Sequence, residues 1–318
     1  MEDLKDPSTT VHAAPGAPAR PRRRWLRALL YLLAAVGVLA LALIGYAVYR
    51  HGKDAGPPRV AIDETAVIDD VMAQTYGKYS AARKGWLYVG DDNITYLMRV
   101  VQQARIPDGA DGDELYFIAS GTAVDGSENA MYGAFHVHPN HPNDGNLAQV
   151  NTQIRYPSTQ AVRPEQVHFE ALSENLWGWV VKAQTGTDPE LYPVTVTNTV
   201  LAPHGDEIAV LGEFLASRES NPGRPCDEAK AAWEAYNRPA PAGSGDEDEG
   251  IDETEEPLRC EKRRWTYRTA TVNGNVPVPI TVTVGGTLDG QAVEARTWKM
   301  MFDPKSFAYD VPAELKNQ

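Results

Sequence analysis

Three histidines stand close together in the stretch GAFHVHPNHPNDGN, residues 133–146. Imidazole nitrogen is a ligand of zinc, copper and iron, so His136, His138 and His141 are the first residues to consider for chemistry. Two histidines separated by one residue on a β-strand point to the same side of that strand. His136 and His138 could therefore bind one metal ion together if a third ligand came from elsewhere. The possible suppliers of that ligand are His141, Asp144, His168, His204 and Asp206.

The strand that carries this histidine pair is predicted over residues 130–139. Along it, Met131, Phe135 and Val137 share one face, and we expect that apolar face to pack into the core. The two histidines lie on the other face, where we expect them to meet solvent or a cleft.

The tetrapeptide HVHP, residues 136–139, resembles the start of the JAB/JAMM metalloprotease signature. That family continues with a serine and then with an aspartate that binds the metal. The corresponding positions in this chain are Leu147 and Val150. The resemblance therefore lacks the aspartate, and we predict a solvated loop without a bound metal or cofactor. A zinc-dependent envelope hydrolase that uses His136 and His138 is the alternative interpretation.

Other catalytic signatures are absent from the sequence. It contains no G-x-S-x-G elbow for a nucleophilic serine, and neither of the glycine-rich motifs that bind phosphate groups. These absences favour a protein without catalytic activity.

The two cysteines, Cys226 and Cys260, are predicted to form a disulfide. They lack the close Cys/His spacing of a zinc site. A bridge between them would close a loop of about 35 residues and stabilise the fold by roughly 3–4 kcal/mol in the chain-entropy model. Such a bridge is stable in an oxidising compartment outside the cytoplasm.

Residues 28–49 form an uncharged apolar run of 22 residues. At about 1.5 Å per residue, a helix of this length would cross the roughly 30 Å core of a bilayer. Arginines are richer on its N-terminal side, so the positive-inside rule keeps residues 1–27 in the cytoplasm. We therefore predict an uncleaved signal-anchor in the bacterial inner membrane, a Gly/Pro-containing stalk over residues 50–59, and a periplasmic domain over residues 60–318.

The charge of the chain restricts its partners. The net charge is −13, and residues 1–27 alone carry +3, so the remainder carries −16. A domain this acidic should repel nucleic acids and attract basic proteins. We therefore expect a protein partner, with a basic partner favoured, and no nucleic acid.

The outer domain is predicted to be α+β and dominated by antiparallel sheet. A helix is expected within residues 62–80 with Asp63 or Thr65 as its cap, and a strand is expected within residues 85–93. The other strands and helices follow from apolar patterning, β-branched content and acidic helix starts. They are strands at 113–124, 130–139 and 191–203, helices at 205–220 and 226–237, and a disordered acidic insertion at 238–257.

The last third of the chain has the clearest β pattern. Ile280, Val282 and Val284 alternate with threonines, which predicts a strand with one buried face within a three-stranded antiparallel meander over residues 263–302. Pro277 and Pro279 suggest that this strand lies at an edge of the sheet.

Together these features predict a single-pass membrane protein whose extracytoplasmic domain binds a partner without catalysing a reaction. The two forms considered are a subunit of an envelope complex and a protective protein that binds a periplasmic effector.

Overall fold

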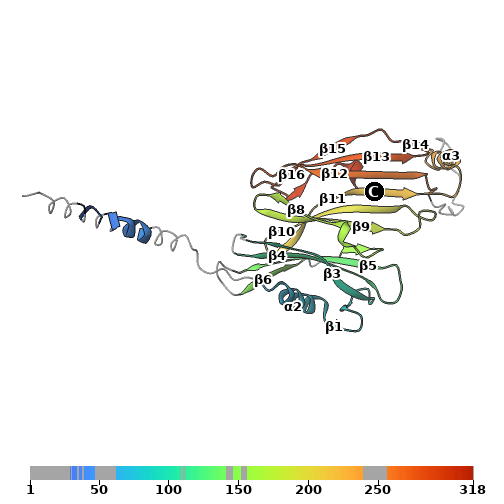
Figure 1. Cartoon of the computed structure of the whole chain (residues 1–318). Coiled ribbons are helices and arrows are strands. Elements are labelled where there is room, and N and C mark those ends of the chain that lie inside the picture. Colours follow the sequence, from blue (N-terminus) through green and yellow to red (C-terminus); the bar gives the residue numbers. More distant parts are fainter. Residues whose placement is uncertain are drawn as a thin grey trace, which may run out of the picture. The chain divides into compact units, whose positions relative to one another are not determined.

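The computed structural model describes residues 29, 31–33, 36–37, 39–46, 62–107, 109, 112–140, 146–151, 156–238 and 256–317 of the 318-residue chain. The chain divides into two compact units, residues 1–58 and residues 59–318. Residues 59–318 fold mostly as antiparallel β-sheet with few helices (Figure 1).

The membrane-spanning helix predicted over residues 28–49 is wrong. No helix in the described part of the chain is both long and apolar enough to cross a membrane. The predicted cytoplasmic tail, residues 1–27, and the predicted stalk, residues 50–59, lie outside the described residues.

The first half of the domain is a group of strands that follows one helix. The helix α2 (Glu64–Tyr76) begins after Asp63, whose carboxylate accepts a hydrogen bond of 3.2 Å from the Ala66 N–H, so the predicted cap is confirmed. The strands β4 and β5 form a hairpin, and β6 and β7 both pair with β5. The strands of this half are β1 (Tyr79–Ser80), β2 (Gly85–Val89), β3 (Thr95–Ile106), β4 (Glu114–Ala123), β5 (Ala130–Pro139), β6 (Leu147–Asn151) and β7 (Tyr156–Ser158).

The second half continues the sheet with longer strands, in the order β8-β9-β10-β11-β12-β13-β15. It joins the first half through one parallel pair between β6 and β11, Asn151 with Glu207. Its elements are η1 (Pro164–Gln166), β8 (Val167–Ser173), β9 (Leu176–Thr185), β10 (Val194–His204), β11 (Glu207–Ser220), α3 (Cys226–Tyr236), β12 (Glu261–Thr269), β13 (Ile280–Leu288), β14 (Gln291–Ala292), β15 (Thr297–Met300), β16 (Phe302–Asp303), β17 (Ala308–Tyr309) and η2 (Ala313–Leu315).

The predicted C-terminal meander is confirmed, since β12, β13 and β15 pair as antiparallel neighbours. The predicted edge position of its middle strand is wrong, because β13 lies between the other two. Pro277 and Pro279 precede Ile280, the first residue of β13, so neither proline removes a hydrogen bond from the ladder.

The predicted helix over residues 205–220 is also wrong, because this segment forms the long strand β11. Ile208, Leu211 and Leu215 are buried and spaced three and four residues apart, as on a helix. The register with β10 shifts at two points, and at each point β11 holds one extra residue. Such β-bulges interrupt the alternation of a strand, and here they produce a helix-like spacing. The predicted helix over residues 226–237 is confirmed as α3.

Three clusters of buried apolar side chains hold the domain together. The first joins α2 to one face of β2–β5 and includes Met72 and Phe117. The second joins the opposite face of β4 and β5 to β8–β10, and includes Tyr116 and Trp179. The third covers the other face of β9 and β10, where Val200 packs against residues of β11–β15 and the C-terminal segment. The central strands are therefore covered on both faces.

Candidate functional site

The predicted metal-binding histidines lie on β5, but the surroundings differ from a solvated loop. His136 is only 8% exposed, and its strand is buried on both faces. The expectation that this face meets solvent is wrong, because β8 and β9 cover it with apolar and aromatic side chains. His138 is half-buried, and its Nδ1 lies 2.9 Å from the carbonyl oxygen of Pro139.

His136 belongs to a polar network, which we call the hairpin network: Glu114 and Tyr116 of β4 with His136 of β5. The Tyr116 hydroxyl donates to Glu114 Oε2 at 2.6 Å, and His136 Nε2 lies 2.9 Å from the same oxygen. The His136 ring also stacks on the Tyr116 ring, with centroids 4.3 Å apart. Burial lowers the pKa of His136, and the nearby Glu114 carboxylate opposes this effect. The arrangement suits a neutral imidazole that donates from Nε2.

Aromatic side chains of the opposing strands β8 and β9 cover the hairpin network. The Tyr116 ring lies 4.9 Å from Phe169 of β8 and 5.5 Å from Trp179 of β9, measured between ring centroids. Burial also raises the pKa of the Tyr116 hydroxyl. A network enclosed in this way stabilises the hairpin, and it does not present its nitrogen atoms to a substrate.

The other proposed metal ligands are not brought to this pair. In the part of the chain that the structure describes, no group of three His, Cys, Asp or Glu residues could hold a metal ion. His168 is exposed on β8, while His204 stacks on Phe307 at 3.8 Å between ring centroids. Asp206 lies in the turn between β10 and β11, and His141 and Asp144 lie outside the described residues.

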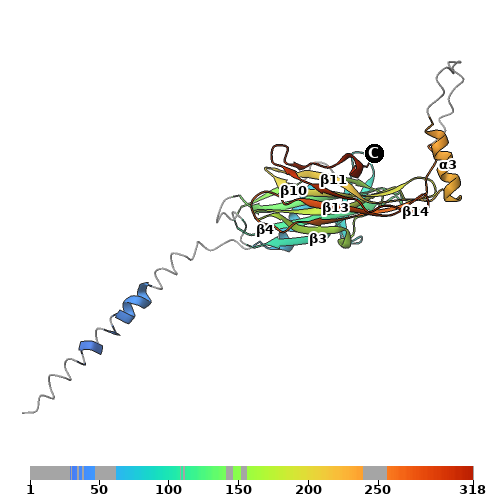
Figure 2. The same cartoon turned by 90° about the horizontal axis from the view of Figure 1, so that it is seen from above.

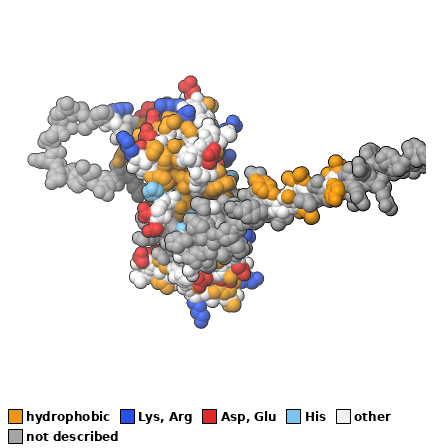
Figure 3. Space-filling view, turned by 90° about the vertical axis from the view of Figure 1, so that its left-hand side faces the viewer, with side chains coloured by type: hydrophobic (Ala, Val, Ile, Leu, Met, Phe, Trp, Pro, Cys, Tyr) orange, Lys and Arg blue, Asp and Glu red, His pale blue; other side chains and the backbone are white. Residues whose placement is uncertain are grey.

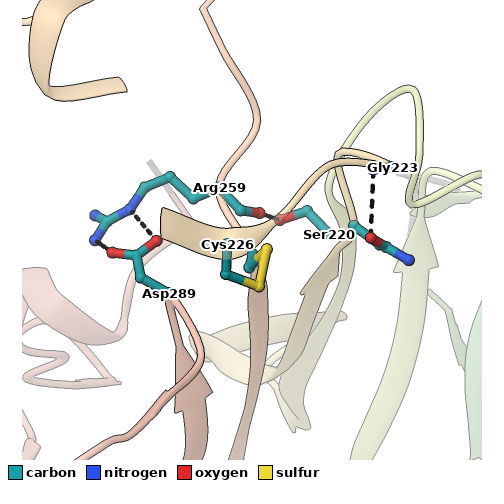
Figure 4. Close-up of a disulfide and its surroundings, with 7 residues drawn as sticks. Ser220, Gly223, Cys226, Arg259 and Asp289 are labelled. Carbon is teal, nitrogen blue, oxygen red and sulfur yellow. Dashed lines mark hydrogen bonds and ion pairs between the residues drawn. A yellow bond between two sulfur atoms is a disulfide. The ribbon is translucent and has the colours of Figure 1, made fainter. Parts of the chain in front are cut away.

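The disulfide between Cys226 and Cys260 is present as predicted, with Cα atoms 5.4 Å apart. Figure 4 shows the contacts around it. The Ser220 hydroxyl donates to the Arg259 carbonyl at 2.5 Å, and the Arg259 guanidinium forms an ion pair with Asp289. The hydrogen bond that Arg259 donates to the Asp289 carboxylate raises the pKa of Arg259. The bridge is therefore reinforced by side chains from β11 and from the β13–β14 turn.

A pocket of about 330 Å³ lies beside this bridge. On one side, the Arg259 guanidinium stacks over the Trp233 ring at 4.3 Å, and the Trp233 N–H donates to Glu256 at 2.9 Å. On the other side stand Leu191 and Tyr192, which are 64% and 61% exposed. We call these residues, with the pocket between them, the disulfide-end surface. Figures 1 and 2 both place α3 at this end of the strands.

Trp233, Glu256 and Arg259 of the disulfide-end surface belong to the most acidic part of the sequence. The loop that the bridge closes, residues 226–260, contains eleven acidic and three basic residues, a net charge of −8 out of −13 for the chain. Its described and exposed acidic residues are Asp227, Glu228, Glu234 and Glu256. At the opposite end of the domain, acidic and basic side chains are interspersed around hydrophobic ones (Figure 3). The sequence between the two cysteines therefore carries more than half of the net negative charge of the chain.

The sequence analysis placed Leu191 and Tyr192 inside a strand and therefore did not predict that both side chains are exposed. Strand β10 begins only at Val194, and the two side chains lie in the turn before it. Pro193 was the available signal, because proline has no N–H for a ladder and its predecessor is restricted in conformation. The predicted acidic insertion, residues 238–257, falls largely outside the described residues, which resume at Glu256.

Comparison with known proteins adds no relative. No family model, no curated protein and no solved structure matches the chain.

Proposed function

We propose that this protein is a non-catalytic binding protein of an oxidising compartment outside the cytoplasm, and that its partner is a basic protein held at the disulfide-end surface. The observation that carries the proposal is the exposure of Leu191 and Tyr192 over a pocket that is bordered on its other side by the acidic segment 226–260. Large hydrophobic side chains that remain exposed next to each other usually mark an interaction site.

The composition of the surface supports a protein partner. Tryptophan, tyrosine and arginine supply most of the binding energy at protein interfaces, and Trp233, Tyr192 and Arg259 are all present here. The surrounding acidic residues favour a partner of opposite charge, because complementary charge speeds association and excludes acidic competitors.

The rigidity of the surface supports the same proposal. Cys226–Cys260 and the Arg259–Asp289 ion pair fix α3 and the start of β12 before any partner arrives. Binding to a pre-ordered surface costs less conformational entropy. A disulfide at this position also favours an extracytoplasmic location, since such bonds persist where the environment is oxidising.

Site-specific photo-crosslinking tests this proposal. A photoreactive amino acid replaces Tyr192 in the full chain in its native cells, and the matched control replaces Val276, which is 58% exposed on a loop away from the pocket. We expect Tyr192 to capture a protein with an excess of lysine and arginine, and Val276 to capture none. Binding of that purified protein should weaken about tenfold or more in Tyr192→Ala.

A charge-reversed variant tests whether the acidic residues attract the partner. Glu228→Lys with Glu234→Lys should weaken binding, most clearly at low salt where charge attraction is least screened. Equal capture at both positions, an acidic captured protein or an unchanged affinity in Tyr192→Ala would each contradict the proposed function.

A further inference from the structure

A second and larger cavity, of about 690 Å³, lies at another place in the domain. It opens between β5 and β7 on one side and β9–β11 on the other, and residues 308–317 border it. We call it the threonine cleft, because Thr185, Thr197 and Thr199 are among its lining residues. Its size is within the roughly 300–1,000 Å³ of typical ligand pockets.

The threonine cleft begins where the apolar packing between β5 and β9–β10 ends. Along β9, Trp179 and Val181 belong to the central core, and Thr185 on the same face lines the cleft. Along β10, Leu201 belongs to the core, and Thr199 lines the cleft. Hydroxyl groups therefore replace apolar side chains within one interlayer space. A space that served packing alone would be filled by apolar groups, because buried polar atoms cost free energy unless they are hydrogen-bonded.

The polar groups of the cleft suit a ligand with many hydroxyl groups. Thr199 donates to the Glu213 carboxylate at 3.4 Å, a long bond for a hydroxyl donor, and Glu213 itself is exposed. Threonine hydroxyls both donate and accept, and a carboxylate accepts only. Tyr132 and Tyr156 stack with ring centroids 4.9 Å apart and provide an aromatic wall.

The charges of the cleft argue against an anionic ligand. Its ionisable lining consists of the carboxylates Glu213 and Asp310 and a single ammonium, Lys316, apart from the tyrosine hydroxyls. A phosphate or carboxylate ligand would meet more negative than positive charge. A purely apolar ligand would give the Glu213 and Asp310 carboxylates no hydrogen-bond donor.

We infer that the threonine cleft binds a neutral saccharide. Sugar hydroxyls would donate to Glu213 and exchange hydrogen bonds with Thr197 and Thr199. The C–H face of the sugar ring would pack against apolar lining residues such as Val210 and Val311. The threonine cleft shares no lining residue with the pocket of the disulfide-end surface, so saccharide binding there does not depend on the proposed protein partner.

Calorimetric titration of the full chain tests the inference with named probes. The neutral probes are cellobiose, maltose and N,N′-diacetylchitobiose, and the anionic probes are glucuronate and glucose 6-phosphate. We expect at least one neutral disaccharide to bind and the anionic probes to bind more weakly. Thr199→Val and Glu213→Gln should each weaken that binding by about tenfold, because each removes hydrogen bonds to the sugar.

The matched control is Thr283→Val on β13, where the Thr283 hydroxyl lies 3.0 Å from the Thr297 hydroxyl away from the cleft. It should leave saccharide binding unchanged, and thermal melting should show that every variant is folded. No binding by any neutral probe, stronger binding by an anionic probe, or equal binding in the cleft variants and Thr283→Val would each overturn the inference.

Discussion

The hairpin network and the threonine cleft occupy two ends of the same interlayer space, and they differ in how that space is filled. One face of β5 carries His136 at the first end and Tyr132 at the second, since residues two apart point the same way. At the first end, Phe169 and Trp179 fill the gap and enclose the polar atoms. At the second end, smaller threonines leave a cavity. Side-chain volume on the opposing strands therefore decides whether polar residues stabilise the fold or remain accessible to a ligand.

The largest expected effect is on the enclosed end. His136→Ala removes a buried ring, leaves a void beside Tyr116 and leaves Glu114 with fewer hydrogen bonds, so unfolding should become easier by about 2–3 kcal/mol. Urea unfolding of the full chain measures this change. His168→Ala, at an exposed position on β8, is the control and should change stability by no more than about 0.5 kcal/mol. Equal losses of stability in His136→Ala and His168→Ala would contradict the claim that the hairpin network stabilises the fold.

A smaller effect should appear with pH. Burial lowers the pKa of His136 below its ordinary value of about 6.5, so at lower pH the unfolded chain binds a proton more readily than the folded one. The free energy of unfolding should then decrease as the pH falls from about 6.5 toward the folded-state pKa, by at most about 1.4 kcal/mol per pH unit, and level off below it. The comparison is urea unfolding of the wild type and of His136→Gln across this range. Greater stability of the wild type at lower pH would mean that attraction to Glu114 outweighs burial.

The smallest expected effect comes from a matched pair of hydroxyl deletions. Tyr116 and Thr199 are both 3% exposed, and each donates a hydrogen bond to a glutamate. Tyr116→Phe should destabilise the fold by about 1 kcal/mol, because the mostly buried Glu114 carboxylate loses a short hydrogen bond from Tyr116. Thr199→Val should change stability by less than about 0.5 kcal/mol, because its 3.4 Å hydrogen bond is long and the exposed Glu213 carboxylate can bind water instead. A larger loss in Thr199→Val than in Tyr116→Phe would reverse the roles assigned to the two ends.

The sequence predicted local structure well where periodicity and end signals agreed. Asp63 marked the start of α2, and the alternation of Ile280, Val282 and Val284 identified β13. The prediction of β11 as a helix failed because two β-bulges gave its buried residues a helical spacing. Bulges depend on pairing with a partner strand, and such pairing is not visible in a local window of sequence.

The candidate sites were less predictable than the fold, because they depend on contacts between distant segments. Sequence identified His136 and His138 as a pair on one face, but it could not show that β8 and β9 cover that face. The threonine cleft could not be predicted for a related reason. Thr197 and Thr199 are typical strand residues in the sequence, and only the fold brings them to the same cavity as Tyr132. The cysteine pair was predictable because only one pairing was possible.

The disulfide has one further consequence, which concerns connectivity. Cys226 and Cys260 close a covalent ring of chain that includes α3 and leads directly into β12. A single backbone cut at any position between 227 and 259 would open that ring, but the two pieces would stay joined through sulfur. The acidic sequence within the ring can therefore be cleaved by a protease without separating the C-terminal strands from the remainder of the sheet.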